Sequence, residues 1–396
     1  MTEWIECTLD KLGEIVGGAT PSTKCEDYYG GSIPWITPKD LSSFKGRYIT
    51  SGERNITEKG LASCSAQMMP KDAVLFTSRA PIGYVAIASQ SVCTNQGFKS
   101  IVVNEKADPL FVYYLLKYNK DAIEAMGSGT TFKEVSGKTM RAVKVRIPLD
   151  VSYQKRIAAV LDSLDTKIEN NERINDNLEQ QAQAIYHERF ETISPNDLPS
   201  EWRIVTLGEV ATISNKSFNP LKEPEILLEH YSIPAFDEAR FPVFELSTSI
   251  KSNKFIIDAS CFMISKLNPT TKRVWKPYCL TGNAVCSTEF IVYKAKDKTI
   301  TDFLYSVIDS NSFSDFMCSH VTGSTGSRQR TTPSDTLSYE LILPSEDDLA
   351  EFQSLVSPMY AQIRINAIEN DRLKRLRDSL LPKLMSGEID VSAVQF

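Results

Sequence analysis

Histidines and cysteines are the residues of this chain best suited to metal binding or catalysis, and none of them forms a complete site. The three histidines, His187, His230 and His320, have no partner at the spacing of a metal site or a catalytic triad. The eight cysteines include no C-x-x-C pair, which argues against a zinc ribbon or a redox motif. The sequence therefore predicts no metal site and no catalytic centre. The scattered cysteines are best explained as reduced thiols, which favours a cytoplasmic protein.

Two short motifs resemble parts of known nucleotide and DNA enzymes but are incomplete. Gly137-Lys138-Thr139 matches the end of a phosphate-binding P-loop, yet Phe132 stands where that motif needs a glycine. Asn219-Pro220-Leu221 and Asn268-Pro269-Thr270 fall short of the Asn-Pro-Pro-aromatic sequence with which DNA amino-methyltransferases hold their target base. We therefore expect a non-catalytic chain that binds no cofactor of its own.

The positive charge of the chain is concentrated locally. The net charge is −6, from 44 basic and 50 acidic residues, so the surface is not uniformly cationic. Residues 131–148 nevertheless contain five cations against one acid, and residues 266–276 contain four cations and no acid. No apolar stretch approaches the length of a membrane span, and the first ten residues are too acidic for a secretory signal.

Small polar loops with adjoining cations occur once in each half of the chain, at residues 127–133 and 323–330. Glycine lets a backbone approach a ligand closely, hydroxyl and N–H groups bind phosphate oxygens, and Arg or Gln can reach base edges. Each loop taken alone could equally be an ordinary solvated connection. Their recurrence favours a binding role.

The two halves of the chain begin and end with similar sequences. Glu3-Trp4 followed by Thr8-Leu9 recurs as Glu201-Trp202 followed by Thr206-Leu207. Val145-Arg146-Ile147-Pro148 likewise corresponds to Leu341-Ile342-Leu343-Pro344, and both are short apolar strands that end at a proline. The chain is therefore an internal repeat.

Each half is followed by a long heptad pattern, which predicts two coiled-coil helices. The first seam consists of Ile157, Leu161, Leu164, Ile168, Asn171, Asn175, Leu178, Ala182 and Ile185. The second consists of Leu349, Phe352, Val356, Met359, Ile363, Asn366, Asn370, Leu373, Arg377, Leu380 and Leu384. The alternative is an amphipathic helix packed on its own domain.

Both seams contain the string I-x-x-N-x-x-x-N-D-x-L, which begins at Ile168 and again 195 residues later at Ile363. Buried asparagines cost stability but fix register, so Asn171, Asn175, Asn366 and Asn370 suggest helices selected to pair in one alignment. Leucine at Asn171 and Asn366 is then expected to raise stability while loosening that register.

The first helix is expected to run from Tyr153 to Phe190, about 55 Å, and to act as a spacer. In the second, Pro358 and Pro382 predict a kink or a shortened helix, because proline removes a backbone donor.

The globular halves show short strands separated by Gly, Pro and Ser, with one helix each, which indicates α+β domains. We expect strands at residues 73–77, 99–103, 261–266 and 289–294, and single helices at 109–126 and 301–318. The predicted organisation is a first domain at 1–150, a helix at 151–195, a second domain at 196–345 and a helix at 346–396. The helices should form an antiparallel coiled coil about a pseudo-twofold.

The whole chain resembles the specificity subunits of type I restriction-modification systems. Gly18-Ala19-Thr20-Pro21-Ser22 with Ile33-Pro34-Trp35-Ile36 resembles the opening of one type of target-recognition domain, and Tyr231-Ser232-Ile233-Pro234-Ala235-Phe236 resembles another. The segment from Leu380 to Ile389 looks like the family's C-terminal ending. Because the two domain types differ, the resemblance implies an asymmetric, interrupted DNA target.

The resemblance also implies partners and cofactors. They are double-stranded DNA, two methyltransferase subunits and two restriction (motor-nuclease) subunits, with S-adenosylmethionine, ATP and magnesium bound by the partners. Candidate DNA contacts, chosen by residue type and position in the loops, are Lys39, Arg79, Lys133, Lys138, Lys216, Lys272, Arg273, Arg328, Gln329 and Arg330. The alternative function is a coiled-coil scaffold that joins two protein-binding domains and does not bind DNA.

Overall fold

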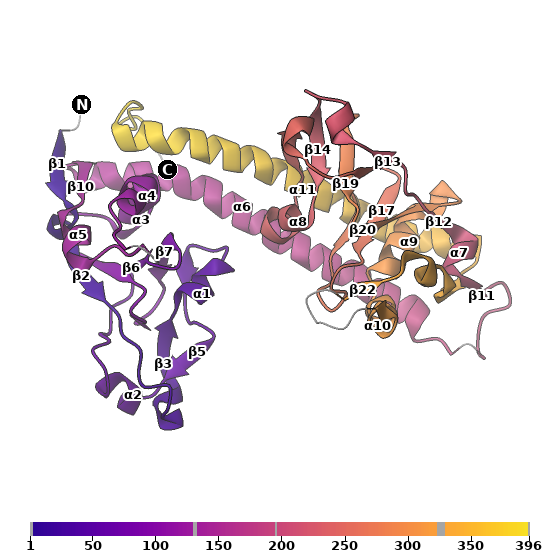
Figure 1. Ribbon diagram of the computed structural model, residues 1–396, viewed down its shortest axis with the longest axis horizontal. Coiled ribbons are helices and arrows are strands. Elements are labelled where there is room, and N and C mark those ends of the chain that lie inside the picture. The colour runs from indigo at the N-terminus through magenta and orange to yellow at the C-terminus, as the bar shows by residue number, and fades with distance from the viewer. Residues whose placement is uncertain (1–2, 130–132, 195, 323–328, 395–396) are drawn as a thin grey trace. The chain divides into compact units, whose positions relative to one another are not determined.

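The computed structural model describes residues 3–129, 133–194, 196–322 and 329–394. They form two compact units, one comprising Met1–Glu169 with Arg372–Phe396 and the other comprising Asn170–Asp371. Each unit contains a globular domain and parts of two long helices, α6 (Val151–Tyr186, magenta) and α11 (Glu346–Ser386, yellow), labelled in Figure 1. The predicted α+β fold with two domains and two long helices is confirmed. The domain before α6 is called the first domain, and the domain between α6 and α11 the second.

The first domain contains a five-stranded sheet in the order β2-β9-β6-β7-β4 and a three-stranded sheet in the order β5-β3-β8. Its strands are β2 (Gly13–Gly17), β3 (Tyr29–Ile36), β4 (Tyr48–Ile49), β5 (Arg54–Ile56), β6 (Val74–Ser78), β7 (Ile82–Ala88), β8 (Cys93–Thr94) and β9 (Lys99–Val103). Pairing is antiparallel except for β4 with β7 and β3 with β8.

The second domain repeats the first sheet as β12-β20-β17-β18 but carries a second sheet of five strands, β13-β16-β19-β14-β15. Its strands are β12 (Ala211–Ile213), β13 (Ser217–Phe218), β14 (Leu227–Tyr231), β15 (Val243–Leu246), β16 (Lys254–Ile256), β17 (Cys261–Ser265), β18 (Val274–Trp275), β19 (Ala284–Ser287) and β20 (Phe290–Ala295). The pair β14 and β19 is parallel, like β3 and β8 in the first domain.

In each unit the first and last strands of the domain pair next to the start of a long helix. β1 (Trp4–Thr8) is antiparallel to β10 (Lys144–Pro148), and β11 (Arg203–Thr206) is antiparallel to β23 (Glu340–Leu343). These are the segments whose sequences are alike in the two halves. The repeat therefore encodes the attachment of each domain to the helix that follows it.

The short helices of the first domain are α1 (Pro38–Ser42), α2 (Glu58–Ala62), α3 (Pro109–Tyr118), α4 (Lys120–Ala125) and α5 (Gly137–Ala142). Those of the second are α7 (Leu207–Val210), α8 (Ile233–Ala239), α9 (Thr301–Ile308) and α10 (Asn311–Ser319). Single helices at 109–126 and 301–318 were therefore wrong. Asn119 ends α3 with its side-chain amide on the Leu115 carbonyl, and Ser310 starts α10 by accepting from the Phe313 N–H, so local capping divides each segment.

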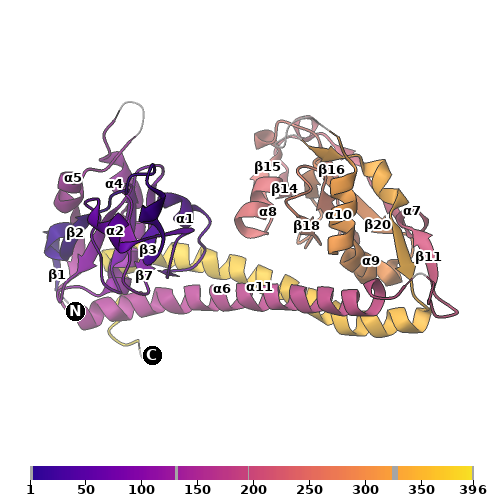
Figure 2. The same cartoon turned by 90° about the horizontal axis from the view of Figure 1, so that it is seen from below.

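The long helices pack antiparallel in both units, and Figure 2 shows α11 lying beside α6. The carboxylate of Asp165 pairs with Arg377 in unit 1, whereas the rings of Tyr186 and Phe352 are in contact in unit 2, so numbers rise on one helix as they fall on the other. Every residue of the two predicted seams is buried or half-buried. Residues 187–191 continue α6 as a π-helical turn.

The shortened helix expected as one alternative at Pro358 and Pro382 is wrong, because α11 is helical through both prolines. Val356 and Tyr360 are buried on either side of Pro358, and Leu384 and Met385 are buried just after Pro382. Packing of these side chains offsets the backbone hydrogen bonds that the prolines remove.

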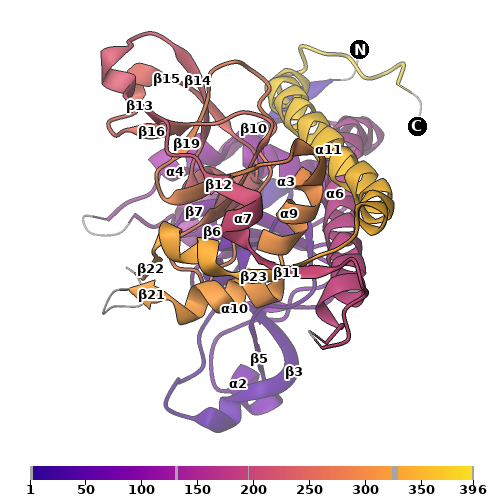
Figure 3. The same cartoon turned by 90° about the vertical axis from the view of Figure 1, so that its right-hand side faces the viewer.

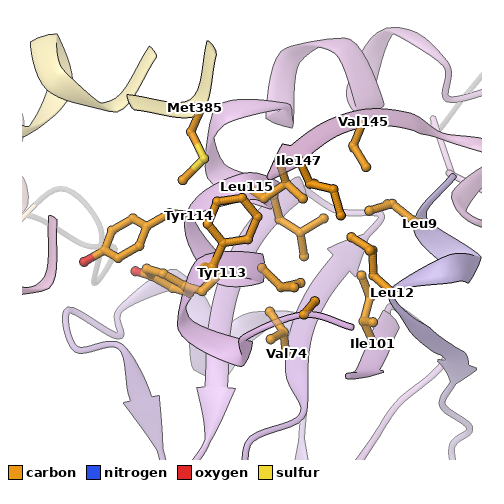
Figure 4. Close-up of a cluster of buried hydrophobic side chains, with 14 of the residues drawn as sticks. Leu9, Leu12, Val74, Ile101, Tyr113, Tyr114, Leu115, Val145, Ile147 and Met385 are labelled. Carbon is orange, nitrogen blue, oxygen red and sulfur yellow. The ribbon is translucent and has the colours of Figure 1, made fainter. Parts of the chain in front are cut away.

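The helices complete the hydrophobic core of each unit. In unit 1, Ile157 of α6 and Met385 of α11 pack in the same core as buried residues of β6, β9 and α3. Figure 4 shows Met385 beside core side chains of the first domain. In unit 2 the corresponding cluster is aromatic: Phe190 lies 5.2 Å from Phe352 and 5.4 Å from Phe303, between ring centroids. Figure 3 shows α9, which carries Phe303, next to α11. Burial of each such side chain stabilises the unit by about 1.5–3 kcal/mol.

None of the helices in the described part of the chain is apolar over a length that could cross a lipid bilayer.

Candidate nucleic-acid interface

The two polar loops predicted from the sequence occupy equivalent places in the two domains. In the first domain, Ser128 and Glu134 exchange backbone hydrogen bonds of 2.9 and 3.0 Å after α4. In the second, β21 (Val321–Thr322) pairs with β22 (Arg330–Thr331) after α10. Both loops are therefore hairpins that follow the same helix pair. Their tips, residues 130–132 and 323–328, lie outside the described residues.

Each hairpin is fixed to the end of an equivalent strand. The Val135 N–H donates to the Ser78 carbonyl at the end of β6 (2.9 Å), and the Thr331 N–H donates to the Lys266 carbonyl just after β17 (3.1 Å). Ser78 and Lys266 also occupy equivalent places. The Ser78 N–H donates to the backbone carbonyl of Gly97, and the Lys266 N–H donates to the backbone carbonyl of Glu289. The segment after the strand and the hairpin thus form one surface in each domain.

The equivalent surfaces carry different charges. Glu134 closes the first hairpin and pairs with Arg79 at 3.5 Å and with Lys99 at 3.6 Å. The corresponding residue of the second hairpin is Arg330, whose Nε and Nη2 atoms bind the Glu289 carboxylate at 3.0 and 3.1 Å. An acid in one domain is therefore replaced by a cation in the other at the same place.

Three candidate contacts of the first domain are exposed in this region or near it. Lys133 follows the hairpin tip and Lys138 lies on α5, and no ion pair is assigned to either among the described residues. Lys39 on α1 is also exposed, but it forms an ion pair with Glu53 at 2.7 Å. Lys39 and Glu53 line a pocket of about 520 Å³ with Phe44 and Tyr48. This pocket was not predicted from the sequence.

Most candidate contacts of the second domain are already engaged within the domain. Arg273 makes a two-pronged contact with Asp237 at 2.6 and 2.9 Å, and Lys272 lies 3.0 Å from the Asp309 carboxylate. Lys216 is exposed before β13. Gln329 is half-buried, and its carbonyl accepts from the Asn268 N–H at 2.9 Å, which joins the hairpin to the loop after β17. Arg328 lies outside the described residues.

The four seam asparagines form two equivalent pairs. The Asn171 side-chain amide donates to Asn370 Oδ1 at 2.8 Å, and the Asn366 amide donates to Asn175 Oδ1, also at 2.8 Å. Adding 195 residues to Asn171 gives Asn366, and subtracting 195 from Asn370 gives Asn175, so one pair maps onto the other. Three of the four side chains are buried, and Asn175 is half-buried.

Arg47 is a buried cation that the sequence did not predict as a functional residue. Only 6% of its side chain is exposed, and its guanidinium bonds to Asp162, to Thr166 at 2.9 Å and to Glu169 at 3.0 and 3.1 Å on α6. These acceptors raise the pKa of Arg47 despite the opposing effect of burial, whereas burial raises the pKa of Asp162. Arg47 therefore attaches the first domain to α6. The sequence gives no signal for this, because its partners lie more than a hundred residues away.

The described residues contain neither a cluster of potential metal ligands nor a disulfide. They include no group of three or more His, Cys, Asp or Glu residues placed to hold a metal ion. The cysteines are free, and burial raises the pKa of Cys93 to about 12 and that of Cys261 to about 11, so these two thiols stay protonated at neutral pH.

Comparison with known proteins identifies relatives of this chain. Residues 1–180 match the family model described as the type I restriction modification DNA specificity domain. The chain is 32% identical to the specificity subunit of the type I restriction enzyme MjaIX of Methanocaldococcus jannaschii, over 98% of this chain and 94% of that protein. It is 29% identical to a type I restriction enzyme specificity subunit of Escherichia coli over 40% of each chain.

A solved structure shares the fold. The crystal structure of a type I restriction-modification S subunit from M. genitalium superposes with a TM-score of 0.61 and 16% identity, over 97% of this chain and 96% of that one. The repeated domains, the paired helices and the sequence match over nearly the whole length lead to one assignment: this chain belongs to the family of type I restriction-modification specificity subunits.

Proposed function

We propose that the chain reads an interrupted, two-part DNA target, with each domain contacting one half-site. The observation that carries this proposal is the pair of equivalent hairpins, which have the same attachment but different residues. Glu134 and Arg330 present opposite charges at the same place in the two domains. Surfaces that differ in this way select different bases, so the target is asymmetric.

The available cations fall into two groups, exposed lysines and arginines held by carboxylates. Lys133, Lys138 and Lys216 are exposed and can bind phosphate oxygens directly. Arg273 and Arg330 are each held by a carboxylate, which fixes the orientation of the guanidinium. In Arg273 this contact uses Nε and Nη2, so Nη1 is placed to donate to base edges in the major groove. Phosphate contacts then position the protein, and the hairpin residues supply sequence selection.

In this proposal the chain is non-catalytic and works in the cytoplasm within a larger enzyme. Two methyltransferase subunits bind it through α6 and α11, and two restriction subunits join them. S-adenosylmethionine, ATP and magnesium are bound by these partners, and the methyltransferase extrudes the target base from the duplex before methyl transfer. The specificity chain supplies the DNA sequence at which this chemistry occurs.

Salt-dependent binding of duplex DNA by the purified full chain tests this proposal. Phosphate contacts release counterions, so affinity for a duplex should fall steeply as salt rises from about 50 to 200 mM. Fluorescence anisotropy with a labelled duplex measures this dependence. A chain that binds no duplex at any salt concentration, alone or with its methyltransferase, would instead be a scaffold joining two protein-binding domains.

A further inference from the structure

Two positions on each long helix contact the adjoining domain and differ between the helices. The two asparagine pairs establish which residues of α6 and α11 correspond, at an offset of 195 residues. By this offset Asp165 of α6 corresponds to Tyr360 of α11, and Glu169 corresponds to Arg364. On each helix the two residues are four positions apart, so they lie about one turn apart on the same face. We call these four residues the pairing positions.

The first pairing position is matched by residue size. α3 and α9 align without a gap over Pro109–Tyr118 and Thr301–Ser310, which places Tyr114 opposite Ser306. The Tyr114 hydroxyl donates to Asp165 Oδ2 at 2.8 Å, whereas the Ser306 hydroxyl lies 2.7 Å from the Tyr360 hydroxyl. In unit 1 the long side chain, Tyr114, comes from the domain and the short one from the helix. In unit 2 the short side chain, Ser306, comes from the domain and the long one from the helix.

The side chains at this first position are almost fully enclosed. Tyr114 and Ser306 are 0% exposed, and Asp165 and Tyr360 are each 6% exposed. Interiors packed at this density tolerate added volume poorly, so the fit depends on one long and one short partner.

The second pairing position is matched by charge. Glu169 accepts two hydrogen bonds from Arg47 of the first domain, at 3.1 Å from Nε and 3.0 Å from Nη2. Arg364 instead donates from Nη2 to the Tyr278 carbonyl of the second domain at 3.1 Å. The acceptor thus lies on α6 in unit 1 and on the domain in unit 2.

We propose that the pairing positions determine which domain can pack on which helix, and that Arg47 is a positioning residue for the first domain. On α11 the first domain would place Tyr114 against the ring of Tyr360. It would also place the guanidinium of Arg47 beside that of Arg364, which is repulsive. On α6 the second domain would place the Tyr278 carbonyl against the Glu169 carboxylate, with two acceptors and no proton between them.

The consequence for function rests on the proposed reading of a two-part DNA target. A domain held at both pairing positions presents its hairpin in one orientation relative to its helix. Loss of the contact at Glu169 allows the first domain to adopt more than one orientation. The spacing between the two half-sites is then less strictly defined, although the bases read by each hairpin stay the same.

A double-mutant cycle on the full chain tests the match directly. Glu169→Arg puts the helix residue of unit 2 into unit 1, and we expect it to lower the melting temperature by about 5 °C. Arg47→Gln in the same chain gives the introduced guanidinium a carbonyl acceptor, while the glutamine amide still donates to Asp162. The double variant Arg47→Gln/Glu169→Arg should therefore recover at least half of the loss, which additive effects would not produce.

Two further variants keep this test interpretable. Lys155→Glu reverses a charge at an exposed position of the same helix and should change the melting temperature by less than about 1 °C. Glu169→Gln removes the charge at nearly constant size, and it replaces Glu169→Arg in the cycle if the arginine variant does not fold. A loss no larger than that of Lys155→Glu, or a double variant that shows additive effects, overturns the proposal.

Methylation with the co-expressed methyltransferase provides a second measurement that a general loss of stability would not change. Substrates carry the target with its spacer lengthened or shortened by one base pair. Relative to the native spacer, we expect Glu169→Arg to raise their methylation by about threefold and the double variant to reverse this. An unchanged ratio contradicts the positioning role. If the native chain directs no methylation, the proposed function fails while the melting cycle still judges the pairing positions.

Discussion

The two recognition domains share one sheet and differ in the other. Strands β2, β9, β6 and β7 of the first domain correspond to β12, β20, β17 and β18 of the second, and both sheets lie beside a helix pair and a polar hairpin. The second sheet has three strands in one domain and five in the other. The shared sheet carries the hairpin in both domains. The other sheet differs in strand number although its region also contacts a long helix in the second domain, where Arg240, between β14 and β15, pairs with Glu179 of α6 at 2.8 Å.

The cores that join the domains to the helices differ in chemistry as well. Unit 2 packs Tyr186, Phe190, Phe303 and Phe352 together, whereas in unit 1 the places of Phe352 and Phe190 are taken by Ile157 and Met385. The same attachment is therefore built from aromatic side chains in one unit and mainly from aliphatic ones in the other. Matched substitutions can test how far the two units are equivalent.

Truncation of the equivalent core residues should have the largest effect. Phe352→Ala removes a fully buried ring and should lower the free energy of unfolding of unit 2 by about 4 kcal/mol. Ile157→Ala should cost unit 1 about 3 kcal/mol, because a smaller side chain is lost. Hydrogen exchange measured on peptides from each unit assigns the loss. If either substitution lowered protection from exchange equally in both units, the two units would unfold as one cooperative unit.

Substitution of the seam asparagines tests the equivalence of the two pairs. Asn171→Leu removes the hydrogen bonds of the Asn171 amide to Asn370 at 2.8 Å and to Glu369 at 2.7 Å, and Asn366→Leu removes the 2.8 Å hydrogen bond to Asn175. Each should lower the free energy of unfolding by about 1–2 kcal/mol in urea titrations. This reverses the expectation from the sequence that leucine at these two positions raises stability. Unequal losses would show that the pseudo-twofold does not extend to energetics.

Acidification should destabilise the second domain through one buried histidine, His230. His230 is buried beside Glu245 and Lys254, and burial lowers its pKa below the ordinary 6.5. The fold therefore favours the neutral ring, so the free energy of unfolding is highest above pH 6.5 and decreases as the pH falls below 6.5 towards the lowered pKa of the folded state.

Thermal unfolding at pH 7 and pH 5.5 with His230→Gln as the variant checks this prediction. The pKa of Glu245 is lowered from 4.5, so this carboxylate stays ionised across the interval. The variant should lose less stability than the native chain between the two pH values. Equal losses in both proteins would mean that His230 does not titrate with folding.

The smallest expected effect concerns exposed cations of the two domains. Lys133→Ala and Lys138→Ala should each reduce the slope of log affinity against log salt by about 1, with a few-fold weaker DNA binding. Lys272→Ala should change the slope less, because Asp309 already neutralises this lysine. Titrations at several salt concentrations measure both. An equal effect of all three would argue that ion pairing within the domain does not limit contact with DNA.

Features that depend on local or periodic sequence could be predicted, whereas long-range contacts could not. The heptad pattern predicted both long helices and the residues of their seams. The repeated Glu-Trp and strand-proline sequences predicted where each domain begins and where it joins the helix that follows. Asn119 and Ser310 divide helices that a hydrophobic pattern alone joins. Arg47 offered no signal, because its function depends on partners on another element. The pairing of Arg273 with Asp237 was equally invisible, so residue type alone could not separate free cations from engaged ones.

Genome-wide mapping of methylated bases tests the central claim most directly. Cells that carry this chain with its methyltransferase are compared with cells that lack only this chain. The account predicts one gapped, asymmetric motif that disappears with the chain and whose two half-sites differ. A methylation pattern that is the same in both cells would contradict the claim that this chain selects the DNA sequence.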